Sequence, residues 1–398
     1  MDKTSRSIAE FSLHDEAQMQ NPYPIYDEVR SRCPMAHSDE LGGFYFVTRY
    51  DEAKTVYKDF RTFSSRDGTG LPAQPVEMYP IDLDPPQQTK YRRILNPAFT
   101  PEAVGKHRPR IEAIVRDLID EFIADGAAEL GAQLIRPTLS ATVLPILGVP
   151  LSDQRMISAN LDYLVRHRAD DPVRCNQIGQ EMAGYLMGIS AARRTAEPQN
   201  DILQTLLAAS IDGAQLTDDT IFRVLLIILF GGLDTTSAAI SEALLHLARS
   251  PDDAARLREG QVPWATAIEE FIRYTSPIQG LRRTVITETE LGGVMVKPGE
   301  FILSLNGAAN RDPERFVEPH RCIIDREMEE HLAFGAGAHV CLGRDLARLV
   351  MDVMLRALLE RIPDYTVPNE FVPEYAAGEA RGMKRLPVTF TPGRRSAG

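Results

Sequence analysis

The sequence predicts a mainly α-helical fold with small β-sheets, and three observations support this prediction. Apolar residues recur with helical spacing through most of the 398-residue chain, whereas strand patterns are short and few. No repeat, low-complexity linker or change of composition divides the chain. We therefore expect one domain over residues 1–398, with a short flexible tip at each end.

Strand patterns are confined to two regions. Residues 43–48, with the sequence Gly-Phe-Tyr-Phe-Val-Thr, form one short candidate. Residues 281–305 read as several strands joined by turns at Gly292-Gly293 and Pro298-Gly299. These segments supply the small sheets of the predicted fold.

Three helices carry the clearest patterns. The first has Thr100 as its N-cap and Pro101 at its first position, and its apolar stripe extends to Ile123. The second is the long pattern from Thr217 to Leu247. The third follows residue 341 and has apolar residues at i, i+4, i+7 and i+8, which are Leu342, Leu346, Leu349 and Val350.

The stretch from Arg66 to Leu83 contains glycine, proline and scattered apolar residues without a period. A loop of this length in a compact domain is usually functional or disordered. We therefore expect this segment to be either a functional loop or a disordered one.

Composition excludes several classes of function. The chain is 43% hydrophobic and 25% charged, and its longest apolar run, Val224 to Phe230, is too short to span a bilayer. Residues 1–11 are polar, so we expect no signal peptide or membrane anchor. The four cysteines form no CxxC pair, and the net charge of −12 argues against nucleic acid as a partner. We expect a cytoplasmic protein.

The most informative segment is the glycine-rich run from Phe334 to Gly343, which contains Cys341. A thiolate ligand needs donors and a lowered pKa, which backbone N–H groups and a following helix N-terminus provide. Two other interpretations exist. A phosphate-binding loop would need a third glycine where Val340 stands, and an isolated cysteine is usually a small apolar filler.

The pattern Phe-Gly-x-Gly-x-His-x-Cys-x-Gly of this run resembles the haem-binding signature of the cytochrome P450 family. The resemblance implies the P450 fold, with haem b (iron protoporphyrin IX) between the long central helix and the helix after the cysteine loop. It implies that Cys341 binds the iron and that Phe334 packs beside the haem. It also places Gly335, His339 and Gly343 in contact with the cofactor.

The pair Gly231-Gly232 inside the long helix costs roughly 1 kcal/mol per glycine relative to alanine, so it needs a reason. Either another element crosses closely there, or the helix opens locally. The segment resembles the acid-alcohol motif of the same family. This resemblance implies that Asp234 and Thr235 relay protons during dioxygen activation and that the glycines face the haem.

Glu270 and Arg273 stand at i and i+3, a pair worth only about 0.2–0.5 kcal/mol on an exposed helix. Their order in the chain resembles the family's Glu-x-x-Arg motif, which stabilises the structure behind the haem. The resemblance suggests Arg321 as the third member of this structural cluster.

The haem propionates would need positively charged partners. By resemblance these are Arg92, Arg283 and His339, with Arg282 as the alternative to Arg283. Gln88 stands where the family often has histidine. From the residues alone, a solvated surface role is an equal alternative for each of them.

The resemblance also places a substrate pocket, which the segment 380–383 would close. Its expected members are Val76, Met78, Tyr79, Ile227, Phe230, Ile278 and Gln279.

The function implied is a monomeric haem-thiolate monooxygenase that inserts one atom of dioxygen into a small apolar organic substrate. Electrons would come from a ferredoxin-type donor docking on the Cys341 side, where Arg92, Arg93, Arg344 and Arg348 offer positive charge. Two alternatives are a P450 that uses peroxide or couples its substrate, and a haem-thiolate sensor without turnover.

Overall fold

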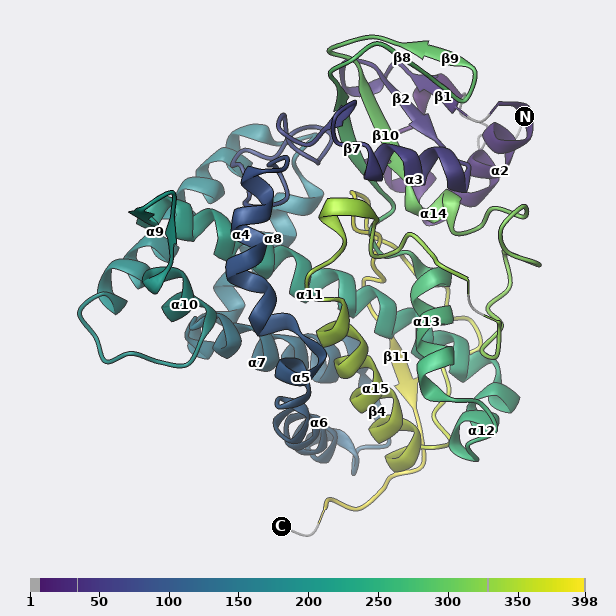
Figure 1. Ribbon diagram of the computed structural model, residues 1–398. Coiled ribbons are helices and arrows are strands. Elements are labelled where there is room, and N and C mark those ends of the chain that lie inside the picture. The colour runs from purple at the N-terminus through teal and green to yellow at the C-terminus, as the bar shows by residue number, and fades with distance from the viewer. Residues whose placement is uncertain (1–7, 34, 328, 397–398) are drawn as a thin grey trace.

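The computed structural model describes residues 8–33, 35–327 and 329–396. A five-stranded sheet lies at one end of the molecule, and a larger helical body fills the rest (Figure 1). The mainly helical fold with small sheets expected from the sequence is confirmed.

The main sheet has the strand order β1-β2-β10-β7-β3. Its pairs are antiparallel except for β10 with β2, which are parallel. Its strands are β1 (Met35–Ser38), β2 (Phe44–Val47), β10 (Phe301–Leu305), β7 (Gly280–Val285) and β3 (Phe63–Ser64). The two-stranded sheets pair β4 (Ala127–Glu129) with β11 (Pro387–Thr389), β5 (Ser210–Ile211) with β6 (Ala214–Gln215), and β8 (Thr289–Leu291) with β9 (Val294–Val296). Both expected strand regions are thus confirmed.

The helices are α1 (Glu16–Gln20), α2 (Tyr23–Arg32), α3 (Tyr50–Lys58), α4 (Gln87–Leu95), α5 (Pro101–Gly105), α6 (Arg108–Phe122), α7 (Arg136–Leu147), α8 (Gln154–Arg166), α9 (Pro172–Arg193), α10 (Ile202–Ala208), α11 (Asp218–Arg249), α12 (Pro251–Arg258), α13 (Trp264–Thr275), α14 (Asn306–Ala309) and α15 (Arg344–Arg361). Helix α11 crosses the body and contacts α7, α9, α13 and α15.

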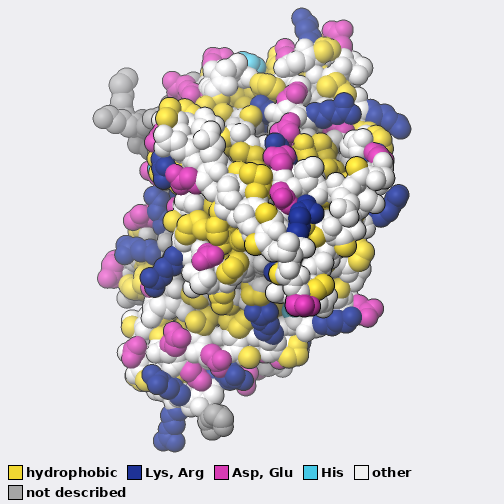
Figure 2. All heavy atoms as spheres, turned by 90° about the vertical axis from the view of Figure 1, so that its left-hand side faces the viewer, with side chains coloured by type: hydrophobic (Ala, Val, Ile, Leu, Met, Phe, Trp, Pro, Cys, Tyr) yellow, Lys and Arg dark blue, Asp and Glu magenta, His cyan; other side chains and the backbone are white. Residues whose placement is uncertain are grey.

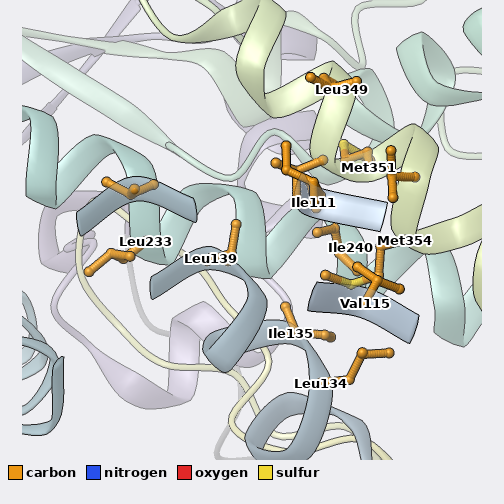
Figure 3. Packing of buried hydrophobic residues seen from close by; sticks show 14 of the residues in the cluster. Ile111, Val115, Leu134, Ile135, Leu139, Leu233, Ile240, Leu349, Met351 and Met354 are labelled. Carbon is orange, nitrogen blue, oxygen red and sulfur yellow. The ribbon is translucent and has the colours of Figure 1, made fainter. Parts of the chain in front are cut away.

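The largest hydrophobic core surrounds α11. Side chains of α6, α7, α11 and α15 meet there, among them Ile111, Leu139, Ile240 and Met354 (Figure 3). Helix α11 is long and apolar enough to cross a membrane, but 56% of its most apolar window is buried inside the protein. Its apolar surface is therefore largely used by this core.

The single helix expected after Thr100 is wrong. Thr100 caps only the short α5, accepting a hydrogen bond from the Ala103 amide at 3.2 Å. The apolar stripe belongs to a separate helix, α6, which has Pro109 in its first turn. Because proline has no N–H to donate to the preceding turn, the chain ends one helix and begins another there.

Glu270 and Arg273 are fully buried and form a bidentate pair, with N–O distances of 2.7 and 2.8 Å. The third member of the cluster is Arg326, whose Nε donates to Glu270 at 3.0 Å. The expected Arg321 is wrong. Its side chain is exposed and pairs with a neighbouring glutamate, while its backbone carbonyl accepts from Arg273 at 3.0 Å.

This cluster yields a stability prediction. Arg326→Ala leaves part of a buried carboxylate unpaired, which lowers the free energy of unfolding by about 3–5 kcal/mol. Arg321→Ala is the matched control, and its unfolding midpoint should stay near that of the wild type. Urea unfolding followed by circular dichroism measures both, and equal losses in the two variants would contradict the assignment.

Candidate functional site

A cavity of about 330 Å³ lies between α11, α15, α4 and the loop before α15. Its walls are mainly apolar, and they include residues from α7 and from the loop at 69–81. Cys341 and Phe334 line it from the cysteine loop, and Asp234 and Thr235 line it from α11. Two motifs that are about a hundred residues apart in sequence therefore face one space.

The cysteine loop has a tight backbone. Gly335 and Gly337 both have φ of +68°, and a Cβ on Gly337 would lie 2.9 Å from the carbonyl oxygen of Tyr57. The Cys341 amide donates to the Phe334 carbonyl at 2.8 Å. Only glycine allows this close approach to the end of α3, so the loop holds Cys341 at a set position.

The Cys341 side chain has accessible surface toward the cavity although protein surrounds it. Burial raises the pKa of this thiol above its ordinary value. The Gly343 amide and the guanidinium groups of Arg92, Arg344 and Arg348 act in the opposite direction. Positive charge brought into the cavity would therefore favour the thiolate form.

Positive groups gather at one edge of the cavity. Arg92 Nη1 donates to the Val340 carbonyl at 2.8 Å, and Arg283 is buried with its Nη2 atom lacking any hydrogen-bond partner. Burial lowers the pKa of Arg283, and burial with these two arginines lowers the pKa of His339 to about 3. A buried arginine with a free donor is suited to an anionic ligand group.

Tyr57 and Gln88 complete this edge. The Arg283 guanidinium lies 5.2 Å from the centre of the Tyr57 ring, and the Tyr57 hydroxyl donates to the Ser304 carbonyl at 3.2 Å. Gln88 Nε2 donates to the Ala338 carbonyl at 2.5 Å. Arg282, the alternative to Arg283, instead donates to backbone carbonyls of residues 67 and 68 and is not among the lining residues.

Helix α11 is continuous through Gly231-Gly232, so of the two alternatives for this glycine pair the local opening of the helix is not observed. The two glycines face different surroundings: Gly232 packs against α7, and Gly231 faces open space. A Cβ on Gly232 would lie 3.1 and 3.2 Å from the Val143 methyl groups of α7, whereas one on Gly231 would meet nothing within 4 Å. Thr235 Oγ1 donates to the Gly231 carbonyl at 2.6 Å.

Asp234 is enclosed by protein next to Thr235. Burial raises the pKa of its carboxyl group, Asp162 acts in the same direction, and Arg166 and Arg136 oppose them. This carboxyl group therefore holds a proton to a higher pH than an exposed aspartate does.

The structure places four of the seven expected pocket residues at the cavity, which are Met78, Ile227, Phe230 and Ile278. Gln279 points away, because successive side chains alternate next to β7, and its amide contacts Tyr26 and Ser276. Ala380 is the lining member of the segment expected to close the pocket.

Val76 and Tyr79 also lie off the cavity. Val76 packs against Gly179 of α9, and the Tyr79 ring packs near Tyr91 at 5.5 Å and Arg223 at 5.4 Å. The irregular loop that contains them has no period from which side-chain direction could be inferred. Sequence reasoning missed the lining residues Thr69, Gly70, Gln74, Leu139, Val143 and Glu379.

Comparison with known proteins decides the family. A family model described as Cytochrome P450 matches residues 153–262 and 264–364. The chain belongs to the cytochrome P450 family. It is thus an oxidoreductase of the P450 monooxygenase type.

Bacterial P450s are similar to this one over nearly its whole length. Cytochrome P450 monooxygenase PikC of Streptomyces venezuelae is 34% identical, over 94% of this chain and 92% of the relative. Cytochrome P450 109 of Bacillus spizizenii is 32% identical, over 95% and 94%. The crystal structure of CYP108D1 from Novosphingobium aromaticivorans superimposes with a TM-score of 0.85 at 30% identity, over 93% of this chain and 94% of the other.

The cavity residues fit the haem-thiolate cofactor that the P450 family implies. Within the described residues, no group of three or more His, Cys, Asp or Glu side chains is arranged to hold a metal ion. A metal at Cys341 must therefore bring most of its own ligands, as haem iron does. The unpaired donor of Arg283 and the apolar walls fit an anionic arm and a flat apolar ring.

The contact of Gly232 with Val143 gives a packing prediction. Gly232→Ala gains up to about 1 kcal/mol of helix propensity. It loses about 1–3 kcal/mol by overpacking against Val143, so the free energy of unfolding should fall. In a Val143→Ala background the same change should no longer lower stability. Urea unfolding of the four proteins measures this coupling, and additive effects would contradict it.

Proposed function

We propose that this P450 uses haem b to insert one atom of dioxygen into a small apolar organic substrate, reducing the other atom to water. The observation that carries the proposal is that Cys341 and the Asp234-Thr235 pair line one cavity from different elements. When bound there, the haem supplies reductive dioxygen activation, which a thiolate ligand favours. Cys341 would hold the iron, and Arg92, Arg283 and His339 would hold the propionates.

The chain's own residues supply proton transfer. Asp234 Oδ can carry a proton because burial raises its pKa. Thr235 donates its hydroxyl hydrogen to the Gly231 carbonyl, so its oxygen lone pairs are free to accept a hydrogen bond from a water molecule beside the substrate. Together they can hold a proton and a water at the cavity wall, as general acid catalysis requires.

The cavity walls indicate the substrate class. Met78, Ile227, Phe230 and Ile278 give apolar contact, which suits a terpenoid, an aromatic or a macrolide-like scaffold. Similar proteins include a 6-deoxyerythronolide B hydroxylase at 32% identity and a steroid C26-monooxygenase at 29%. Hydroxylation is therefore the product type that we propose.

Electrons would come from a ferredoxin-type donor on the Cys341 side. Of the four arginines expected there, Arg93 and Arg344 are exposed. Arg92 turns inward to a backbone carbonyl, and Arg348 binds Glu269 at 2.5 and 3.0 Å. The positive charge available to such a donor is thus smaller than the sequence suggests.

The surface and cysteines agree with a cytoplasmic enzyme. On the face that carries α9 and α10, positive and negative side chains are interspersed without a continuous basic patch (Figure 2). This distribution gives no support to nucleic acid binding on that face. All four cysteines are free thiols.

The spectrum of the reduced protein with carbon monoxide tests the ligand. We expect the strongly red-shifted Soret band of thiolate ligation, and Cys341→His should lose it. Cys33→Ser, which changes a cysteine outside the cavity, should keep it. A histidine-like spectrum in the wild type would refute the proposal.

The role of the Thr235 hydroxyl is tested by the amount of product formed per reductant consumed. Thr235→Ala should still consume reductant and dioxygen but should release several-fold more hydrogen peroxide per product, because the water held by its hydroxyl is lost. Thr235→Ser keeps the hydroxyl and should remain close to the wild type. Unchanged coupling in Thr235→Ala would mean that Thr235 is only a helix residue.

A further inference from the structure

The loop from Thr69 to Asp82 forms one wall of the cavity without regular secondary structure. Its residues facing the cavity are Thr69, Gly70, Gln74, Met78, Pro80 and Ile81. Loops with few internal contacts open easily. A side chain that bonds both ends of this loop would therefore hold this wall of the cavity in place.

Asp82 joins the two ends of this loop. Its side chain is buried, and Oδ1 accepts from the Thr69 amide at 3.0 Å and from Thr69 Oγ1 at 3.1 Å. Oδ2 accepts from the Met78 amide at 2.8 Å. Hydrogen bonds to a carboxylate are stronger than those between neutral groups, so a single side chain holds Thr69 and Met78 together.

Other contacts attach the loop to its surroundings but do not close it. The Leu71 amide donates to Glu379 Oε1 at 2.9 Å, and the Tyr79 amide donates to the Arg223 carbonyl at 3.3 Å. The Arg282 amide also donates to the Thr69 carbonyl at 2.8 Å, and the Asp82 amide donates to the Met78 carbonyl at 3.0 Å. None of these contacts joins Thr69 to Met78. The Asp82 side chain, by contrast, accepts hydrogen bonds from both residues at once.

We infer that Asp82 is a positioning residue that sets which ligands the cavity accepts, by holding Thr69 and Met78 in place without touching the ligand itself. Asp82 is not among the residues lining the cavity, whereas Thr69 and Met78 are. Without the carboxylate, buried amides lose their acceptors, and the loop rearranges to satisfy them. The inference rests on the proposed function in taking the cavity ligand to be the substrate.

The test uses Asp82→Asn in the haem-containing protein. The amide side chain keeps the size but presents a donor to one of the N–H groups. Glu77→Gln is the matched control, since it makes the same charge change in the same loop at an exposed side chain. Thr69→Val removes the bond from Oγ1 to Asp82 but also changes a side chain that lines the cavity. It therefore enters only the exchange measurement, in which the amide of residue 69 should exchange at an intermediate rate.

Two measurements follow. In Asp82→Asn, hydrogen exchange of the Thr69 and Met78 amides should be about tenfold faster, the factor expected for one lost hydrogen bond. Peptides from α11 and α15 should exchange as in the wild type. The second measurement uses 1-alkylimidazoles of increasing chain length, whose dissociation constants are read from the Soret shift. The ratio of the constant for the longest chain to that for the shortest chain should differ about fivefold between Asp82→Asn and the wild type.

Three outcomes would overturn the inference. Amide exchange at residues 69 and 78 that stays at the wild-type rate would show that Asp82 does not close the loop. Faster exchange with unchanged ligand ratios would show that the closure does not set ligand choice. Equally faster exchange in α15 would reveal a general stability role. Hydrogen exchange does not depend on thiolate ligation, so failure of the carbon monoxide spectrum remains a separate result.

Discussion

Burial of the Cys341 sulfur is the constraint on which the rest of the site depends. A thiolate away from water is unfavourable unless donors and positive charge surround it. The cysteine loop supplies a backbone amide, three arginines lie within electrostatic range, and α15 begins three residues later. These groups oppose the effect of burial without overcoming it, because the pKa of the thiol remains raised. A ligand that brings positive charge to the sulfur would favour the thiolate, and the haem iron that the P450 family implies would bring such charge.

Other buried charged side chains also need partners inside the protein. Whether they have them distinguishes the groups that support the fold from those that can bind a ligand. Glu270 is fully buried and accepts hydrogen bonds from both Arg273 and Arg326. Burial alone would raise the pKa of Glu379, but Arg168 and His14 bring it below its ordinary value. These carboxylates are satisfied within the protein. Arg283, in contrast, reaches the cavity with one donor atom unpaired. The excess positive charge therefore lies where an anionic ligand group would bind.

Sequence patterns identified the parts of the site that have a fixed local spacing. The cysteine loop and the acid-alcohol pair were found this way, and both line the cavity. Errors arose where position depends on irregular backbone. Arg326 rather than Arg321 meets Glu270, because the segment around them has no periodicity that orients side chains. Gln279 follows the lining residue Ile278 and points to the opposite side. The break between α5 and α6 carried a local signal in Pro109, which outweighs the continuous apolar stripe.

Tyr57, at the end of α3, connects the five-stranded main sheet to the cavity, although it lies far from Cys341 along the chain. Its backbone carbonyl lies against Gly337 of the cysteine loop, its ring lies under Arg283, and its hydroxyl bonds β10. One residue at the end of α3 therefore contacts both the cysteine loop and Arg283, and so helps to set the distance between them. The loop that forms the ligand wall is tied to the same sheet, because the Arg282 amide of β7 donates to the Thr69 carbonyl at 2.8 Å. The sheet therefore positions both the residues around Cys341 and Arg283 and the start of the wall opposite them.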